Sequence, residues 1–278
     1  MSEIETACTP GIVIVGAGQA ATTLAASLRT GGYDGSITLI GEESVPPYQR
    51  PPLSKSYILG DTSVDRLHLK PHQFYVEANI TLRLGELVSS IDPDAKTVTV
   101  GDTALPYTHL ALTTGASPVP LPEAIGGSLE GVHLMRTLRD ADLLASRFDA
   151  GEHALIVGGG YIGLEAAAVL RAKGFDVTLV EAATRILQRV AAHPTSEAVR
   201  ELHRRRGVVM IEGAKLDRLE GIDGKVRRAL LSDGRTLPAD IVVVGIGVRP
   251  RIELAQAAGL VIDNGVATDA FGRTSAPG

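Results

Sequence analysis

Two glycine-rich motifs of the same kind constrain the fold of this chain more than any other feature of its sequence. The first spans residues 16–21 (GAGQAA) and the second spans residues 158–163 (GGGYIG). Each follows a short apolar run, at residues 11–15 and 154–157, and each opens an alanine-rich stretch. A strand before the motif and a helix after it form the context in which such glycines indicate a dinucleotide site. The pair therefore predicts two nucleotide-binding βαβ units in one chain.

The positions within each motif have distinct mechanical roles. The first glycine permits a tight turn, and the second lets backbone amides approach a pyrophosphate at the helix N-terminus. The last position must be small so that the helix packs closely on the strand. These three positions are Gly16, Gly18 and Ala21 in the first motif and Gly158, Gly160 and Gly163 in the second. The alternative is two tight turns that bind no ligand, but two motifs in phase with two βαβ units favour binding.

An acidic residue near the end of the second strand completes such a site. Its carboxylate accepts hydrogen bonds from the ribose hydroxyls of an adenosine and repels a 2′-phosphate. Glu42 lies 26 residues after Gly16, and Glu181 lies 23 residues after Gly158. Because two alanines and no arginine pair follow Glu181, the second site is predicted to prefer NAD to NADP. The alternative for either glutamate is a solvated charge at a strand end.

Length and composition set broader bounds on the chain. With 278 residues and 44% hydrophobic content, it is predicted to fold into two globular domains of about 100–200 residues each. The formal net charge of −5 and the scattered basic residues argue against a nucleic-acid partner. The single cysteine, Cys8, excludes an intrachain disulfide and fits a reducing compartment, so we expect a cytoplasmic protein. No apolar run approaches the ~18 residues of a membrane span, and no targeting segment is expected.

The order of apolar runs and glycines predicts that two units share one plan. For the first unit it predicts a strand at 11–16, a helix at 19–30, a strand at 36–41 and a proline-rich loop at 41–52. A small antiparallel meander is expected at 81–84, 87–91 and 97–100, followed by a further strand at 110–113. For the second unit we expect a helix at 161–173, a helix at 195–206, and strands at 153–157, 176–181, 208–211, 215–222, 225–231 and 240–245.

A proline-rich segment at residues 118–122 lacks periodic pattern and predicts a domain boundary. After the strand at 240–245 the pattern breaks again, so we expect the chain to return to the first domain. The predicted fold class is α/β, with two Rossmann-like three-layer domains that carry small antiparallel meanders. Residues 1–116 and 247–278 form the first domain, and residues 117–246 form the second, inserted in the first.

The stretch from Pro47 to Lys55 (PYQRPPLSK) resembles the P-Y-x-R-P-P-L-S-K segment of FAD-dependent NADH:ferredoxin reductases of bacterial oxygenase systems. That family belongs to the pyridine nucleotide-disulphide oxidoreductase superfamily. Further matches lie at residues 113–115, 134–137, 158–165, 245–250 and 273–275, so the resemblance runs from about Ile12 to the end. It implies a glutathione reductase-like fold in which the first domain binds FAD and the inserted domain binds NAD(H).

The resemblance also implies roles for matched positions. The expected FAD contacts are Gly16, Gly18, Ala20, Ala21, Glu42, Arg50, Lys55, Val88, Thr114, Gly115 and Arg136. The expected NAD(H) contacts are Gly158, Gly160, Tyr161, Ile162, Gly163, Glu165 and Glu181, and Gly247 is a further expected cofactor contact. Lys55 and Glu165 are the candidate catalytic pair, because a lysine beside the flavin would stabilise the negative charge that reduction adds. Without the motif, Lys55 would be interpreted as a solvated lysine and Glu165 as a carboxylate favoured at a helix start.

By this resemblance the protein is a flavoprotein reductase that passes electrons from NADH through FAD to a ferredoxin-type (2Fe-2S) or rubredoxin-type acceptor. Cys8 alone cannot form the redox pair of the related disulfide reductases. The enzymatic alternative is an NADH oxidase or quinone reductase. A redox-inactive nucleotide-binding fragment is also open, because the family continues beyond the position of Gly278 into an A-x-G-D motif and a C-terminal interface domain. We therefore expect a truncated chain.

Two groups of basic residues are interpreted structurally. The run at residues 203–206 (HRRR) ends a predicted helix, where cations complement the helix dipole, in preference to docking a ferredoxin. No metal site is predicted, since the histidines at 68, 72, 109 and 133 show no metal-ligand spacing.

Thr108 and Arg251 depart from the aspartate and asparagine that the family tends to have at these positions.

Overall fold

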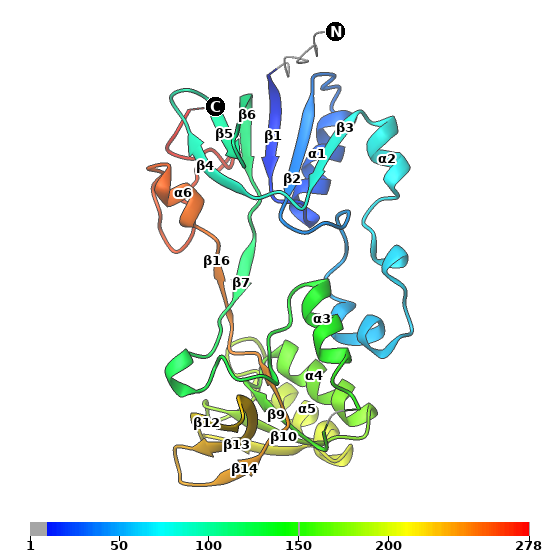
Figure 1. Ribbon diagram of the computed structural model, residues 1–278, viewed down its shortest axis with the longest axis vertical. Coiled ribbons are helices and arrows are strands. Elements are labelled where there is room, and N and C mark those ends of the chain that lie inside the picture. The colour runs from blue at the N-terminus through cyan, green and yellow to red at the C-terminus, as the bar shows by residue number, and fades with distance from the viewer. Residues whose placement is uncertain (1–9, 150, 278) are drawn as a thin grey trace. The chain divides into compact units, whose positions relative to one another are not determined.

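The chain folds into two compact units in this computed structural model, which describes residues 10–149 and 151–277. The first unit contains the chain up to Gln49, Leu67–Ala116 and the chain from Pro250 onward (Figure 1). The second contains Arg50–Arg66 and Ser117–Arg249, so in sequence it is inserted in the first. Cys8, on which the arguments about disulfides and compartment rest, lies outside the described residues.

The first unit is built on a six-stranded sheet with strand order β3-β2-β1-β6-β5-β4. Its strands are β1 (Gly11–Val15), β2 (Ile37–Gly41), β3 (Ile80–Leu84), β4 (Val88–Asp92), β5 (Thr97–Val100) and β6 (Thr103–Leu112). Its helices are α1 (Gln19–Thr30), α2 (His72–Glu77) and α6 (Glu253–Ala257). Strand β1 pairs in parallel with β2 on one side and β6 on the other. The carboxyl ends of these three strands therefore surround the first glycine motif.

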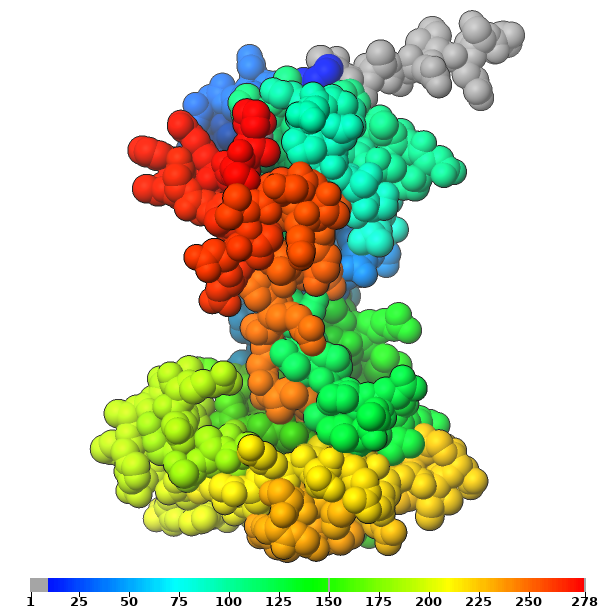
Figure 2. Space-filling model, turned by 90° about the vertical axis from the view of Figure 1, so that its left-hand side faces the viewer, coloured from blue at the N-terminus to red at the C-terminus, as the bar shows by residue number. Residues whose placement is uncertain are grey.

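The alternation of side chains along β1 divides the core of this unit in two. Ile12 and Ile14 pack with α1 and with Tyr75 of α2. Val13 and Val15 pack on the opposite face, in a cluster that includes Val88 of β4 and to which Leu254 of α6 is added. Figure 2 shows α6, in orange, lying against the cyan residues of β4, with which it is in contact. Five consecutive apolar residues are buried in β1 because both faces of the strand are covered.

One predicted element has a different partner from the one expected. The sequence pattern predicts an antiparallel meander that includes the strand at 81–84, but β3 pairs in parallel with β2, from Ile37 opposite Ile80 to Gly41 opposite Leu84. The meander consists of β4, β5 and the first half of β6. The reason is packing, since Ile80 and Leu82 contribute to the cluster around α1 and α2. Strand propensity alone does not specify which neighbour a strand joins.

The second unit repeats the plan with a five-stranded sheet of order β11-β10-β9-β15-β8 and a three-stranded sheet of order β12-β13-β14. The first sheet contains β8 (Val132–His133), β9 (His153–Val157), β10 (Asp176–Glu181), β11 (Val209–Glu212) and β15 (Ile241–Val244). The second contains β12 (Leu216–Ile222), β13 (Lys225–Leu231) and β14 (Thr236–Pro238). The helices are α3 (Leu138–Ala145), α4 (Tyr161–Ala172) and α5 (His193–Arg205).

Short segments complete the chain. The strands β7 (Ala116–Pro118) and β16 (Val248–Pro250) pair with each other, and the chain passes from one unit to the next within them. The short helical turns are η1 (Leu53–Tyr57), η2 (Val64–Leu67) and η3 (Glu123–Ile125). The predicted domain bounds of 1–116 with 247–278 and of 117–246 assign one cofactor to each domain. Packing alone does not test that assignment, so these bounds stay a prediction.

The basic run predicted to end a helix forms the last turn of α5, with His203, Arg204 and Arg205, and its C-cap, Arg206. Burial lowers the pKa of His203, so this imidazole is neutral near pH 7 and the charge at the helix end comes from the arginines. Within residues 10–149 and 151–277, no helix combines the length and apolar character needed to cross a bilayer.

Candidate dinucleotide sites

The first glycine motif forms the tight turn between β1 and α1. Gly16 has φ +106°, and a Cβ there would lie 2.3 Å from the carbonyl oxygen of Thr113, so no other residue fits. Gly18 is the N-cap residue of α1, and nothing lies within 4 Å of the position its Cβ would occupy. The first turn of α1 has no acidic residue and no side-chain cap. Its free amides therefore face open space that suits an anion.

The second motif forms the same turn between β9 and α4. Gly158 also has φ +106°, and a Cβ there would lie 2.4 Å from the carbonyl oxygen of Gly245. A Cβ at Gly163 would lie 2.0 Å from the carbonyl oxygen of Gly158, so this glycine permits α4 to approach the turn. Gly160 is the N-cap residue, with no side-chain cap and no acidic residue in the first turn. The two motifs thus present the same kind of anion cradle.

The two acidic residues stand at the ends of β2 and β10, beside their motifs. Both carboxylate oxygens of Glu181 accept hydrogen bonds from backbone amides, Oε2 from Gly159 at 2.6 Å and Oε1 from Ala183 at 2.7 Å. Glu181 is therefore fixed against the second motif. Glu42 is more exposed, and its Oε2 accepts a hydrogen bond from Nη1 of Arg251 at 2.7 Å. Each unit thus has one carboxylate at the end of the strand that follows its motif, and the ribose role of both carboxylates stays a prediction.

The candidate catalytic pair is in direct contact within the second unit. Nζ of Lys55 lies 2.8 Å from Oε1 of Glu165 and donates to the carbonyl oxygen of Pro51 at 3.0 Å. The hydroxyl of Ser54, which is 3% exposed, donates to Oε2 of Glu165 at 2.5 Å. The carboxylate is thus held by a buried hydroxyl on one oxygen and an exposed ammonium on the other. Ser54 was not identified from the sequence, although it stands inside the PPLSK stretch.

The helical turn η1 is interrupted at Lys55. Lys55 has φ −136° and ψ −111°, non-helical values that interrupt the turn between Ser54 and Tyr57. Tyr57, at the end of η1, donates to Oδ1 of Asp142 at 2.8 Å and so ties η1 to α3. Burial and the neighbouring carboxylate of Asp142 raise the pKa of Tyr57, so it remains a donor.

The remaining positions expected to contact FAD are divided between the two units. In the second unit, Arg50 donates from Nη1 to the carbonyl oxygen of Arg136 at 2.7 Å. In the first unit, Val88 is buried in β4, and the Thr114 hydroxyl donates to the carbonyl oxygen of Arg251 at 2.9 Å. Gly115 has φ +72° at the turn after β6. The arrangement within each unit is compatible with the implied roles, which stay predictions.

Exposed apolar side chains surround the second motif. Tyr161 and Ile162, at the start of α4, are 58% and 39% exposed, and Ile246 beside Gly247 is 37% exposed. An apolar surface next to an anion cradle suits the flat base of a nucleotide. Gly247 has φ +127°, and a Cβ there would lie 4.0 Å from Nη2 of Arg189.

Arg189 is a candidate binding residue that the sequence pattern did not reveal. In the described part of the chain its side chain forms no hydrogen bond or ion pair, and it lies close to the turn at Gly247. Its position suits a cation that neutralises a pyrophosphate at the second motif. The available signal was a basic residue eight positions after Glu181, which is too common to be distinctive.

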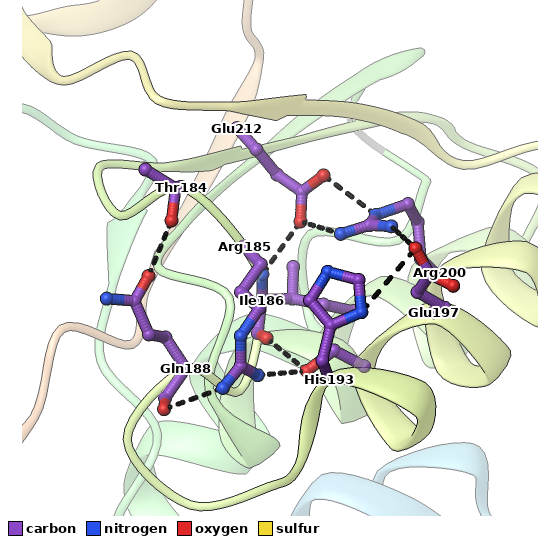
Figure 3. Close-up of polar contacts among 9 residues, drawn as sticks. Thr184, Arg185, Ile186, Gln188, His193, Glu197, Arg200 and Glu212 are labelled. Carbon is purple, nitrogen blue, oxygen red and sulfur yellow. Dashed lines mark hydrogen bonds and ion pairs between the residues drawn. The ribbon is translucent and has the colours of Figure 1, made fainter.

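The loop that carries Arg189 is anchored by a polar network (Figure 3). The amide of Ile186 donates to Oε1 of Glu212 at 2.7 Å, and Arg200 lies 2.8 Å from the other carboxylate oxygen of Glu212. Buried Ser196 donates to the carbonyl oxygen of Ile186 at 2.8 Å. The amide of Leu187 donates to the carbonyl oxygen of Gly159 at 2.9 Å, which joins the loop to the motif. These hydrogen bonds thus hold the loop beside the second motif.

Two glycine turns of the same geometry, one in each α/β unit, are the arrangement expected of a protein with two dinucleotide sites. Residues 10–278 match the pyridine nucleotide-disulphide oxidoreductase family, to which the chain therefore belongs. Proteins of this family bind FAD and NAD(H). Among solved structures, putidaredoxin reductase in its covalent complex with putidaredoxin superposes with a TM-score of 0.92 at 40% identity, over 97% of this chain and 66% of that one, which shows the same fold.

The curated relatives are electron-transfer reductases. Rhodocoxin reductase of Rhodococcus erythropolis is 43% identical over 264 residues, which cover 95% of this chain and 62% of that protein. A ferredoxin–NAD(P)+ reductase of Sphingomonas sp. is 42% identical over 96% of this chain and 64% of its own length. The chain thus spans less than two thirds of the length of these relatives.

Proposed function

We propose that the protein is an FAD-dependent NADH:ferredoxin reductase, which passes electrons from NADH through FAD to an iron–sulfur protein of an oxygenase system. The observation that carries the proposal is the pair of phosphate cradles at Gly16–Ala21 and Gly158–Gly163 in one chain, with a Lys55–Glu165 ion pair anchored by Ser54. Relatives named as ferredoxin, putidaredoxin and rhodocoxin reductases support the same class of reaction.

The residues present fit both cofactors. In the first unit, the open cradle at Gly18 and the carboxylate of Glu42 would hold the pyrophosphate and adenosine ribose of FAD. In the second, the cradle at Gly160, the fixed carboxylate of Glu181 and the guanidinium of Arg189 would hold NADH. The exposed faces of Tyr161 and Ile162 would contact the nicotinamide half.

The chain's own residues supply orientation and charge. The chemistry supplied by the bound cofactors would be hydride donation by a nicotinamide and single-electron release by a flavin. Lys55 is half exposed, so its ammonium can leave Glu165 and move toward the negative charge of a reduced flavin while it stays hydrated. Glu165 would keep its hydrogen bond from Ser54 during this exchange, so the carboxylate would not follow the lysine. No proton needs to be abstracted from the nicotinamide, so no general base is required.

The acceptor is proposed to be a small ferredoxin-type (2Fe-2S) or rubredoxin-type protein. The support comes from relatives named rubredoxin–NAD+ reductase from Pseudomonas putida and putidaredoxin reductase. We also propose a cytoplasmic location, which rests on the single cysteine in the sequence.

A comparison of acceptors tests the proposed function. The chain reconstituted with FAD is mixed with NADH and, in separate reactions, with a 2Fe-2S ferredoxin, a rubredoxin, a quinone or oxygen alone. Reduction of one of the two iron–sulfur proteins at a rate well above that of oxygen or quinone is the expected result. Faster consumption of oxygen or quinone would assign an oxidase or quinone reductase instead, and no turnover with any acceptor would leave a nucleotide-binding fragment.

Replacing Glu181 with alanine is expected to reduce the preference of the chain for NADH over NADPH. The substitution removes a charged acceptor for the ribose hydroxyls, so NADH affinity should fall about tenfold while NADPH affinity changes less. Glu181→Gln, which keeps one acceptor and the shape of the side chain, should have an intermediate effect. Glu220→Ala in β12 removes another carboxylate of the same unit and serves as the control. Titration with each dinucleotide measures both affinities, and an unchanged ratio would remove Glu181 from the ribose role.

A further inference from the structure

Arg251 enters the first unit directly after β16, with its backbone fixed on both sides. Its amide donates to the carbonyl oxygen of Gly115 at 3.0 Å, and its carbonyl oxygen accepts from the Thr114 hydroxyl at 2.9 Å. Both partners follow the carboxyl end of β6. The side chain of Arg251 therefore starts from a well-defined point beside the first glycine motif.

From that point the side chain reaches the end of a different strand. Nη1 of Arg251 lies 2.7 Å from Oε2 of Glu42, which follows β2. Because β1 lies between β2 and β6 in the sheet, the ion pair passes across the carboxyl end of β1, where the first motif begins. This is the edge at which open α/β sheets bind their ligands.

The ion pair leaves half of the Glu42 carboxylate available. Within the described residues Oε2 is engaged by Arg251, whereas no hydrogen-bond donor contacts Oε1. Glu42 is 55% exposed and Arg251 is 45% exposed, so a ligand can reach both groups. A free glutamate at a strand end samples several rotamers, and the guanidinium restricts it to those in which Oε2 is paired and Oε1 is left for a ligand.

We propose that Arg251 is a positioning residue for Glu42 and thereby strengthens recognition of the adenosine half of FAD. This inference rests on the proposed function, which assigns FAD to the first site. Arg251 acts through Glu42 on the adenosine ribose, which FMN lacks. Its contribution therefore appears in the affinity for FAD and not in the affinity for FMN.

The opposite role would be obstruction, in which the ion pair closes the crevice and must open before a ligand enters. The two roles predict opposite signs. A positioning residue weakens FAD binding when it is removed, whereas an obstructing residue tightens it.

Flavin titrations of the full chain test the proposal, with Kd measured by quenching of flavin fluorescence. Arg251→Met is expected to raise the Kd for FAD about fivefold and to leave the Kd for FMN unchanged. Arg251→Lys should recover part of the loss. Arg251→Met combined with Glu42→Gln should bind FAD no more weakly than Glu42→Gln alone, because the arginine acts only through the glutamate. Arg205→Met, which removes an Arg–Glu surface pair of the same 2.7 Å distance from α5, is the matched control.

Three results would overturn the inference. Arg251→Met could bind FAD as tightly as the unchanged chain or more tightly, or it could weaken FMN and FAD equally, or its effect could add fully to that of Glu42→Gln. Failure of the unchanged chain to bind FAD would instead overturn the proposed function, and the inference with it. Thermal unfolding of each variant separates a binding effect from a folding defect, and exposed Arg251 is not expected to alter the Tm appreciably.

Discussion

Replacing Gly158 with alanine is expected to abolish measurable NADH binding while FAD binding is retained. The substitution adds a Cβ 2.4 Å from the carbonyl oxygen of Gly245 at a residue whose φ is +106°. The turn must move to relieve this contact, and displacement of the cradle amides by about 1 Å costs on the order of 100-fold in binding or rate. Isothermal titration with NADH and with FAD measures the two sites separately.

Gly174→Ala is the matched control for this experiment. Gly174 has φ +93° in the turn after α4, but nothing lies within 4 Å of its Cβ position. It therefore carries the cost of a left-handed alanine, about 1 kcal/mol, without a steric clash. The corresponding variant of the first motif is Gly16→Ala, whose Cβ would lie 2.3 Å from the carbonyl oxygen of Thr113. It should abolish FAD binding and retain NADH binding; loss of the same cofactor in both variants would contradict the assignment of two separate sites.

Replacing Lys55 with methionine is expected to slow the reduction of bound flavin by NADH about 100-fold, an effect of the size seen when a charge-stabilising donor is removed from an active site. The ammonium is the cation held by Glu165 at 2.8 Å, and methionine keeps the length of the side chain without its charge. Stopped-flow recording of flavin absorbance measures the rate. The affinity for NADH should change much less than the rate, because the proposed role is at the flavin.

Two further variants make this test specific. Lys55→Arg retains a cation and should recover much of the rate. Lys173→Met removes a lysine that contacts the carbonyl oxygen of Leu59 in the same unit, and it should leave the rate unchanged. A normal rate in Lys55→Met would show that Lys55 has no electrostatic role, and equal losses in all three variants would indicate a general defect of the unit.

The regular elements around the motifs could be predicted closely from the sequence. The helix at 19–30 and the strand at 153–157 have the bounds expected from their apolar runs and flanking glycines. The short helix α3 was missed, although Thr137 and Asp140 form a capping box that was visible as a threonine followed three residues later by an acid. The partner of β3 could not be predicted, since it depends on packing around Tyr75 and not on the strand itself.

Some residues of the candidate sites could be predicted from the sequence, and others could not. The glycine positions and the two carboxylates follow from local spacing, because the motif, turn and strand end are close in sequence. The contact between Ser54 and Glu165 joins residues 111 positions apart, and no periodic pattern reports such a distance. The position of Lys55 near Glu165 was expected only through the resemblance to a family. Arg189 and the pairing of Arg251 with Glu42 required the three-dimensional structure.

We expect this one chain to bind both dinucleotides and to pass electrons between them. The most direct measurement is to saturate the chain with FAD, remove the excess by gel filtration, and add NADH without oxygen while the visible flavin absorbance is recorded. The expected result is a yellow protein with one FAD per chain, bleached by one equivalent of NADH. A colourless protein after gel filtration, or a yellow one whose absorbance NADH does not change, would contradict it.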